Sequence, residues 1–383
     1  MNKVYILGGL RTPIVVKNGK YKHIPAEDLG VTVLNALRER FLPDVIPDGI
    51  IAGNAVGTGG NIARLMSLKS GLPADVPAFT VDMQCASGAT AIAMGYDQIA
   101  VGNGEVYICG GMESSSLQPE RRYNINDDRY QKTPKGDGRY MTAQFSPQEL
   151  AENAMLQGAD RVIRSENIKK EELDYWCIES HKRAAAWASN GDLQDLIVPV
   201  SGYTVDDGIR ENMSQQLLNR LPSILGKDSL LNAGNTCLIN DGAAFVVLVS
   251  EKWLKKYPQS IPLGMIEGTC MLGCNPLESP RGAMLTADFL LKKHNLKYED
   301  MGAIEFNEAF AVIDVLFQRK HPELIDRYNV LGGALAYGHP YGASGGILML
   351  HLLKALEKKS GSWGIMSIAG AGGMGQSILI KKM

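Results

Sequence analysis

A short motif that occurs twice constrains the fold more than any other feature of this sequence. Ala86-Ser87-Gly88 precedes an apolar helical pattern that leads to a short apolar run and then to Gly110-Gly111. Ala343-Ser344-Gly345 precedes a second such pattern, which again leads to an apolar run and then to Gly372-Gly373. Internal self-similarity is the sequence sign of a repeated structural unit. We therefore expect two related halves, with a chance match of short motifs as the alternative, since the two spacings differ by a few residues.

Short apolar runs alternate with helical patterns along the chain. Runs bounded by glycine or charge are typical of buried strands, and the helical patterns show apolar residues at a period near 3.6. The expected strands cover residues 4–8, 49–53, 105–109, 243–250 and 364–368. The expected helices cover residues 26–40, 89–101, 149–164, 171–189 and 344–358. This alternation predicts a layered α/β architecture.

Residues 117–231 differ from the rest of the chain, because they are polar and charged at first and helical later. A long segment of this kind inside a compact fold is interpreted as an insertion, which could cover a substrate. We assign residues 1–116 and 232–255 to the N-terminal half, 117–231 to an inserted loop domain and 256–383 to the C-terminal half.

The charges of the chain are nearly balanced. Lys and Arg together number 39, Asp and Glu number 41, and the formal net charge is −2 at pH 7. Nucleic-acid-binding proteins usually carry a basic excess, so we expect no nucleic-acid partner. Hydrophobic residues make up 45% and charged residues 21% of the sequence. That is the composition of a compact globular chain rather than a disordered one.

Cysteine usage and hydropathy indicate the setting in which the chain works. Its six cysteines include no Cys-x-x-Cys pair and have no His companions, so neither a disulfide framework nor a metal site is expected. No run approaches the roughly 18 apolar residues of a membrane span. The first apolar stretch ends at Arg11, too soon for a secretory signal. We expect a reducing, cytoplasmic setting.

Cys85 is the first candidate for chemistry. It follows the apolar stretch 78–81 and precedes a helical pattern, which would place its sulfur at a helix N-terminus. Free N–H groups and the helix dipole stabilise a thiolate there, so a nucleophile is one interpretation. A small buried hydrophobic residue is the other, because most free cysteines are of that kind.

His339 and Asn307 are the next candidates. His339 lies in a glycine-dense segment, where backbone can approach a ligand closely, and is interpreted as an acid, a base or a hydrogen-bond donor. A histidine satisfied within the core is the alternative. Asn307 begins a helical pattern and could simply be an N-cap. Together with Cys85 these residues supply a thiol for acyl transfer and donors for an oxyanion.

With these residues in place, the sequence resembles the thiolase family of acyl-CoA C-acyltransferases along essentially its whole length. The matching segments are Arg11-Thr12-Pro13, Ala26-Glu27-Asp28-Leu29-Gly30, Gly53-Asn54, Asn61-Ile62-Ala63-Arg64, Cys85-Ala86-Ser87-Gly88, Gly110-Gly111-Met112-Glu113-Ser114, Ala233-Gly234-Asn235, Asn240-Asp241-Gly242-Ala243-Ala244, Asn307-Glu308-Ala309-Phe310, Gly338-His339-Pro340 and Gly372-Gly373-Met374-Gly375.

The resemblance implies a duplicated fold of five α-β-α-β-α layers with an inserted loop domain, assembled as a homodimer or homotetramer. It implies that Cys85 becomes acylated and that His339 activates it and then helps to hold the thioester oxygen. Asn307 would position a water for that oxyanion hole, while the backbone N–H groups of Cys85 and Ala371 would form a second hole. Acyl-CoA and CoA are the implied partners, with no permanently bound cofactor and no metal.

The chain departs from the family pattern at positions that matter for chemistry. Ala369 stands where the family has a second catalytic cysteine, and alanine cannot carry a proton. Asp82 replaces an asparagine, Cys237 replaces a serine near the pantetheine arm, and Ser146-Pro147 replaces a His-Met pair. Cys237 and Ser146 are therefore expected at the CoA and substrate site, and Cys237 could replace the lost base or merely fill space.

Three functions remain open from the sequence. The first is a thiolase-type acyl-CoA C-acyltransferase of fatty acid metabolism, which makes or cleaves 3-oxoacyl-CoA by ping-pong transfer through Cys85. The second is a single-cysteine enzyme for decarboxylative condensation, acyl transfer or thioester hydrolysis. The third is an acyl-CoA-binding scaffold subunit, for which the loss at Ala369 would be a first step.

Overall fold

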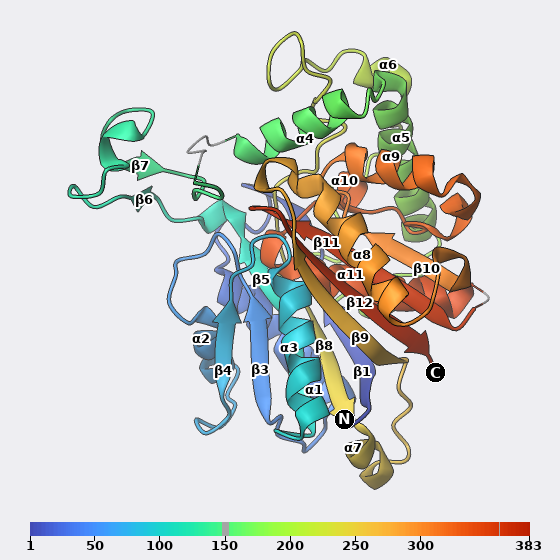
Figure 1. Ribbon diagram of the computed structural model, residues 1–383. Helices are drawn as coiled ribbons and strands as arrows, with labels where there is room; N and C mark the ends of the chain where they lie inside the picture. The colour runs from blue at the N-terminus through green and yellow to red at the C-terminus, as the bar shows by residue number, and fades with distance from the viewer. Residues whose placement is uncertain (148–152, 360) are drawn as a thin grey trace.

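One continuous mixed sheet runs through the protein (Figure 1). The computed structural model describes residues 1–147, 153–359 and 361–383. The ten strands of the sheet follow the order β10-β11-β12-β9-β1-β8-β5-β3-β4, and β2 pairs with β8. The strands of the first half are β1 (Val4–Arg11), β2 (Val15–Val16), β3 (Gly49–Gly53), β4 (Ala78–Val81), β5 (Val106–Ser114) and β8 (Asn240–Ser250). Those of the second half are β9 (Gly264–Gly273), β10 (Met301–Phe306), β11 (Trp363–Gly370) and β12 (Met374–Lys382).

The two halves of the sheet repeat the same strand pattern. In the first half β8 is antiparallel to both β1 and β5, and β3 runs parallel to β5. In the second half β12 is antiparallel to both β9 and β11, and β10 runs parallel to β11. The halves join where β1 pairs with β9. The prediction of a duplicated α/β fold is confirmed by this pattern.

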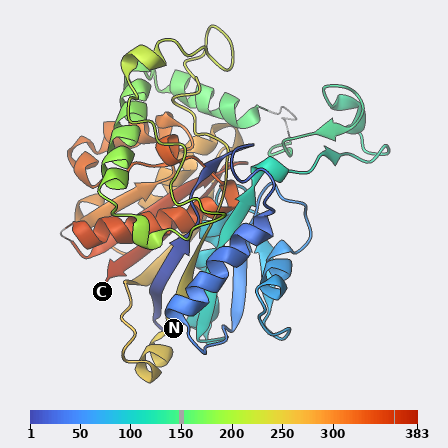
Figure 2. The same ribbon diagram turned by 180° about the vertical axis from the view of Figure 1, so that it is seen from behind.

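Helices and sheet halves form alternating layers. The helices that cover the two halves are α1 (Ala26–Phe41), α2 (Ile62–Lys69), α8 (Gly282–Lys293) and α9 (Ala311–Lys320). Helices α3 (Ser87–Val101) and α11 (Ser344–Lys358) contact each other and strands of both halves, so they form the middle layer. Figure 2 shows α1 across the strands of the first half, whereas α3 lies on their other side in Figure 1.

Three apolar clusters hold these layers together. Leu29, Val33 and Leu37 of α1 pack on the first half of the sheet. Burying a leucine or valine side chain contributes about 1.5–3 kcal/mol, so a face of this kind fixes the helix on the sheet. The middle layer is built around α3 and α11, and the third cluster joins α8 and α9 to the second half.

The starts of α3 and α11 touch through glycines. A Cβ atom built on Gly345 would lie 2.0 Å from the backbone nitrogen of Ala89, and one on Gly88 would lie 2.5 Å from the carbonyl oxygen of Gly342. Side chains do not fit at such distances, so only glycine allows the two backbones to approach this closely. The two copies of the Ala-Ser-Gly motif therefore meet at the middle of the molecule.

The segment 117–231 contains a hairpin and helices of its own. The hairpin of β6 (Arg121–Arg122) and β7 (Arg139–Tyr140) projects from the body in both Figure 1 and Figure 2. Helices α4 (Ala154–Ser165) and α5 (Lys170–Ser189) follow it, and α5 packs against α9 and α10 (Ala334–Tyr337). The first residues of the expected helix 149–164 fall partly outside the described residues.

The helices that were expected lie close to their expected ranges. Some strands differ from the expected ranges. Strands β5 and β11 are longer than expected, because their glycines continue the strand instead of ending it. No pattern predicted β9 or β12, which pair with each other along most of their length. Glu267, Gly268 and Thr269 interrupt the apolar run of β9, so the strand carries no clear apolar signal.

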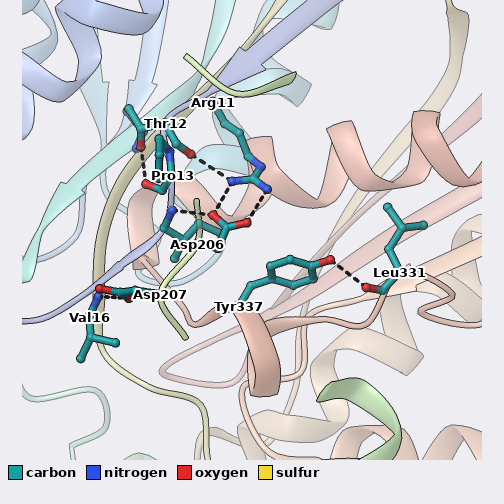
Figure 3. A network of polar contacts seen from close by, with 10 residues as sticks. Arg11, Thr12, Pro13, Val16, Asp206, Asp207, Leu331 and Tyr337 are labelled. Atoms are coloured by element: carbon teal, nitrogen blue, oxygen red, sulfur yellow. Dashed lines mark hydrogen bonds and ion pairs between the residues drawn. The ribbon is translucent and has the colours of Figure 1, made fainter. Parts of the chain in front are cut away.

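A buried ion pair ties the segment 117–231 to the first half (Figure 3). Arg11, fully buried at the end of β1, donates from Nη1 and Nη2 to the two carboxylate oxygens of Asp206, at 2.7 and 2.8 Å. The same carboxylate accepts a hydrogen bond from the backbone N–H of Ile14. Tyr337 lies beside this pair in Figure 3 and donates its hydroxyl to Leu331. The insertion is thereby fixed next to α10, which leads into the loop of His339.

Asp206→Ala should lower the free energy of unfolding by about 3–5 kcal/mol, because it leaves the Arg11 guanidinium buried and without a carboxylate. Urea unfolding followed by circular dichroism measures the change. The double variant Arg11→Met/Asp206→Leu should recover most of the loss, since no unpaired charge remains. An unchanged urea midpoint for Asp206→Ala would contradict the role given to this pair.

Candidate active site

Cys85 lies in a tight turn between β4 and α3. Gln84, directly before it, has a φ of 52°, a left-handed conformation that costs energy for a residue with a side chain. The backbone N–H and the side-chain amide of Gln84 both donate to Asp82 Oδ1, at 2.9 and 3.0 Å. Ser87 Oγ accepts from the N–H of Met83 and donates to the carbonyl of Gln84. These bonds hold the turn in its strained form and fix the direction of the residue that follows.

The thiol of Cys85 is buried, with 9% of the residue exposed. Burial raises the pKa of the Cys85 thiol to about 12, although hydrogen bonds from the N–H groups of Cys85 and Ala371 oppose the shift. Burial therefore opposes the thiolate that the helix start would stabilise. Helix α3 begins at Ser87, and the loss of water around the sulfur outweighs the N–H groups. A thiol of this kind needs a base before it can attack a carbonyl carbon.

His339 is held by its backbone and by its Nδ1 atom. Its backbone N–H donates to the carbonyl of Leu238 and to Asn240 Oδ1, at 3.1 and 2.9 Å. Its Nδ1 atom lies 2.6 Å from Ser344 Oγ, and that hydroxyl donates to the carbonyl of Pro340 at 3.0 Å. Since the hydroxyl proton points to Pro340, Ser344 accepts from Nδ1–H. The other ring nitrogen, Nε2, consequently carries a lone pair.

The Nε2 atom of His339 faces Asn307. Asn307 follows β10, and its Nδ2 atom lies 3.3 Å from His339 Nε2. Its backbone N–H donates to the carbonyl of Ser367 on β11, which fixes its place beside the end of that strand. Burial lowers the pKa of His339 to about 3. His339 is thus a neutral imidazole at neutral pH, with a free base at Nε2.

Two further residues border this cluster, and neither was singled out by the sequence. The ring of Tyr341 stands edge-on to the ring of His339, with centroids 5.0 Å apart and an angle of 89° between planes. Burial raises the pKa of the Tyr341 phenol, and the neighbouring Cys237, Cys85 and Glu113 raise it further. Only its place two residues after His339 could have drawn attention to it.

Glu113 is the second of these residues and lies near the end of β5. Its carboxylate accepts from Asn54 Nδ2 and from the backbone N–H groups of Ala55, Val56 and Gly342. Burial raises the pKa of Glu113 to about 7, against the effect of these donors. The carboxylate joins the loop after β3 to the loop of His339, which makes it a positioning residue. Glu113 lies in one of the segments that resemble the family, but no spacing in the sequence indicates this contact.

The remaining expected residues lie around the same loops. Ala369, 4% exposed, is near the end of β11 and pairs with Gly375, so the position of the missing thiol is occupied by a methyl group. The N–H of Cys237 donates to the carbonyl of Ala309 at 3.1 Å, and its thiol interacts electrostatically with that of Cys85. Ser146 is buried, and the carbonyl of its neighbour Phe145 lies against the turn after Ala371.

The described residues contain no membrane-spanning helix and one cluster of potential metal ligands. None of the described helices combines the length and apolarity that crossing a bilayer requires. Glu299, His321 and Glu323 are the one group there whose ligand atoms come within 4.8 Å of each other. Both of its carboxylates are exposed, and exposed acidic groups of this kind are common without an ion.

Comparisons with known proteins agree with this arrangement. The family model for the thiolase N-terminal domain matches residues 4–252, and that for the thiolase C-terminal domain matches residues 260–382. A probable acetyl-CoA acyltransferase of Staphylococcus aureus is 33% identical over 100% of both chains. The chain therefore belongs to the thiolase family and is an acyltransferase of that family.

Solved structures show the same fold. Human mitochondrial 3-ketoacyl-CoA thiolase in complex with CoA is similar with a TM-score of 0.90 and 30% identity, covering 100% of this chain and 98% of the other. Acat5 thiolase from Ascaris suum in complex with coenzyme A is similar with a TM-score of 0.87 and 30% identity, covering 100% of both chains. Acetyl-CoA acetyltransferase of Bacillus anthracis is similar with a TM-score of 0.89 and 26% identity, covering 100% of this chain and 99% of the other.

His339→Ala should slow the acylation of Cys85 by about 10²–10⁴-fold, because it removes the free base at Nε2. Rapid-quench mass spectrometry after mixing with acetyl-CoA measures the rate. His23→Ala, at an exposed position, serves as the control and should keep the native rate. A native rate in His339→Ala would remove this residue from the mechanism.

The acylation rate should not fall between pH 7.5 and about 5, the range in which an ordinary histidine becomes protonated. The pKa of His339 is lowered to about 3, so the neutral base persists throughout this range and is lost only at lower pH. The same rapid-quench assay, run as a pH series, measures the acylation rate at each pH. Because the pKa of Glu113 is itself raised to about 7, a fall in rate with a midpoint near 6.5 that persists in Glu113→Gln would show that His339 titrates normally.

Proposed function

We propose that this protein transfers acyl groups between carbon and sulfur of CoA thioesters, with Cys85 as the carrier. One observation supports this most strongly. The N–H groups of Cys85 and Ala371 lower the pKa of the Cys85 thiol against the larger effect of burial, and the thiol lies among the same buried loops that hold the pair of His339 and Asn307. A nucleophile, a neutral base and two sets of donors are the groups that acyl transfer requires.

The first half of the reaction follows from these groups. With a 3-oxoacyl-CoA, His339 takes the thiol proton while the Cys85 sulfur attacks the C3 carbonyl carbon. The negative oxygen that forms is held by the N–H groups of Cys85 and Ala371. The C2–C3 bond then breaks, the acyl group stays on sulfur, and the electron pair moves to C2 as an enolate. Protonated His339 and Asn307 hold the oxygen of that enolate.

The second half restores the enzyme. The enolate carbon takes a proton and leaves as acetyl-CoA, and free CoA then enters. The sulfur of CoA attacks the thioester carbon on Cys85. The proton of the CoA thiol goes to the group that gave a proton to C2. The Cys85 sulfur then leaves the acyl group and recovers its own proton from His339. The products are acyl-CoA and acetyl-CoA, and synthesis is the same sequence reversed.

Ala369 supports a second candidate. Its methyl group offers no proton for C2 and is nearly buried. Decarboxylative condensation needs no such proton, since loss of CO₂ from a 2-carboxyacyl thioester itself leaves the electron pair at C2. A single-cysteine condensing enzyme is therefore the alternative, and a malonyl thioester would be its donor.

CoA is the proposed carrier of both acyl groups. Two family members of about 30% identity were solved as CoA complexes. We place part of the CoA site on the segment 117–231, near Ser146, and part near Cys237. We also propose that the chain works in the cytoplasm as a homodimer or homotetramer, without a permanently bound cofactor.

The native protein should cleave acetoacetyl-CoA in the presence of CoA, and Ala369→Cys should raise the rate by less than about tenfold, because another residue already moves the C2 proton. The loss of acetoacetyl-CoA absorbance measures both rates. Ala369→Ser is the matched control, since it adds similar volume without a thiol. A native protein without activity beside an active Ala369→Cys would favour the condensing enzyme.

A further inference from the structure

Cys237 lies between the two loops that carry Asn307 and His339. On one side its N–H donates to the carbonyl of Ala309, at 3.1 Å, and Thr236 pairs with Phe310. On the other side Ile239 pairs with His339, whose N–H donates to the carbonyl of Leu238. The backbone on both sides of Cys237 is therefore hydrogen-bonded to the two loops that carry Asn307 and His339.

The thiol of Cys237 lies near the thiol of Cys85 and the hydroxyl of Tyr341. Besides burial, Cys85 raises the pKa of Cys237, and both cysteines raise the pKa of Tyr341. Cys237 is also partly exposed, in contrast to the buried Cys109 and Cys177. A molecule that reaches Cys85 thus comes near a second thiol.

The other candidates for moving a proton are less suited to the task. Burial raises the pKa values of the Cys270 and Cys274 thiols, and Cys85 contributes to neither shift. The Glu113 carboxylate accepts from three backbone N–H groups and one side-chain amide, so its oxygens are engaged in holding the loops in place. Of the other five thiols of the chain, all of them in described residues, only that of Cys237 has a pKa that Cys85 raises.

We propose that Cys237 is the second thiol of the reaction and moves the proton at C2, the task that Ala369 cannot perform. The inference rests on the proposed function. In cleavage the Cys237 S–H bond breaks and its proton bonds to C2 of the enolate, which leaves a Cys237 thiolate. That thiolate then takes the proton of the incoming CoA thiol as the CoA sulfur attacks the acyl group on Cys85. In synthesis the same thiolate removes the proton from C2 of acetyl-CoA.

The surroundings of Cys237 agree with this role. Burial raises the pKa of its thiol, so the group is protonated at rest, as an acid for the enolate must be. The phenol of Tyr341 also stays protonated, because its pKa is raised well above the ordinary value by burial. A protonated phenol nearby can donate a hydrogen bond to the thiolate once the proton has left.

Cys237→Ala tests the proposal through two readouts of the same protein. Exchange of the acetyl protons of acetyl-CoA with D₂O, followed by NMR, reports proton transfer at C2 and should fall by about 10²–10⁴-fold. Acetylation of Cys85 by acetyl-CoA, followed by mass spectrometry, should persist, since it needs no proton at C2. Cys270→Ala, which removes another partly exposed thiol, is the matched control and should exchange at the native rate.

The outcomes separate this inference from the proposed function. Recovery of proton exchange in the double variant Cys237→Ala/Ala369→Cys would support the inference, because residue 369 on β11 then supplies the thiol that Cys237→Ala removes. Cys237→Ser, with nearly the same volume, should fold and show the same loss as Cys237→Ala. Native exchange in both Cys237 variants, with Cys85 still acetylated, would overturn the inference alone. No acetylation of Cys85 in the native protein would overturn the proposed function and this inference with it.

Discussion

The close contact between the starts of α3 and α11 is the constraint on which the site depends. Gly88 and Gly345 let two backbones approach to distances that no side chain allows, and the carbonyl of Gly342 lies in the same contact. Cys85 lies two residues before the start of α3, and His339 lies five residues before the start of α11, in the loop that leads to it. The duplication therefore brings together two residues that are far apart in the sequence, and the same contact explains why the motif occurs twice.

Burial determines the chemical state of the pair that results. A thiol whose pKa is raised and an imidazole whose pKa is lowered are both neutral, so the site at rest holds no separated charges. The two N–H groups at the sulfur and the amide of Asn307 are already in place for the charges that appear during reaction. Such preorganised donors stabilise a transition state more than they stabilise the resting enzyme.

Much of the fold and part of the site could be predicted from the sequence. Helical periodicity and the repeated motif were sufficient for the layered, duplicated architecture, because both are local patterns. Strands β9 and β12 were not predicted, since their burial depends on pairing with each other. The contacts of Glu113 and Tyr341 also escaped prediction, because they join segments far apart in the sequence. The raised pKa of the Cys85 thiol was not predicted, since the motif shows the helix start but not the depth of burial.

A crystal structure of the protein after soaking in acetyl-CoA tests the central claim most directly. The account predicts an acetyl group on the Cys85 sulfur, with its carbonyl oxygen within hydrogen-bonding distance of the N–H groups of Cys85 and Ala371. His339 should then lie beside the sulfur with Nε2 directed into the site. An acetyl group on Cys237 instead, or bound acetyl-CoA beside an unmodified Cys85, would contradict the account.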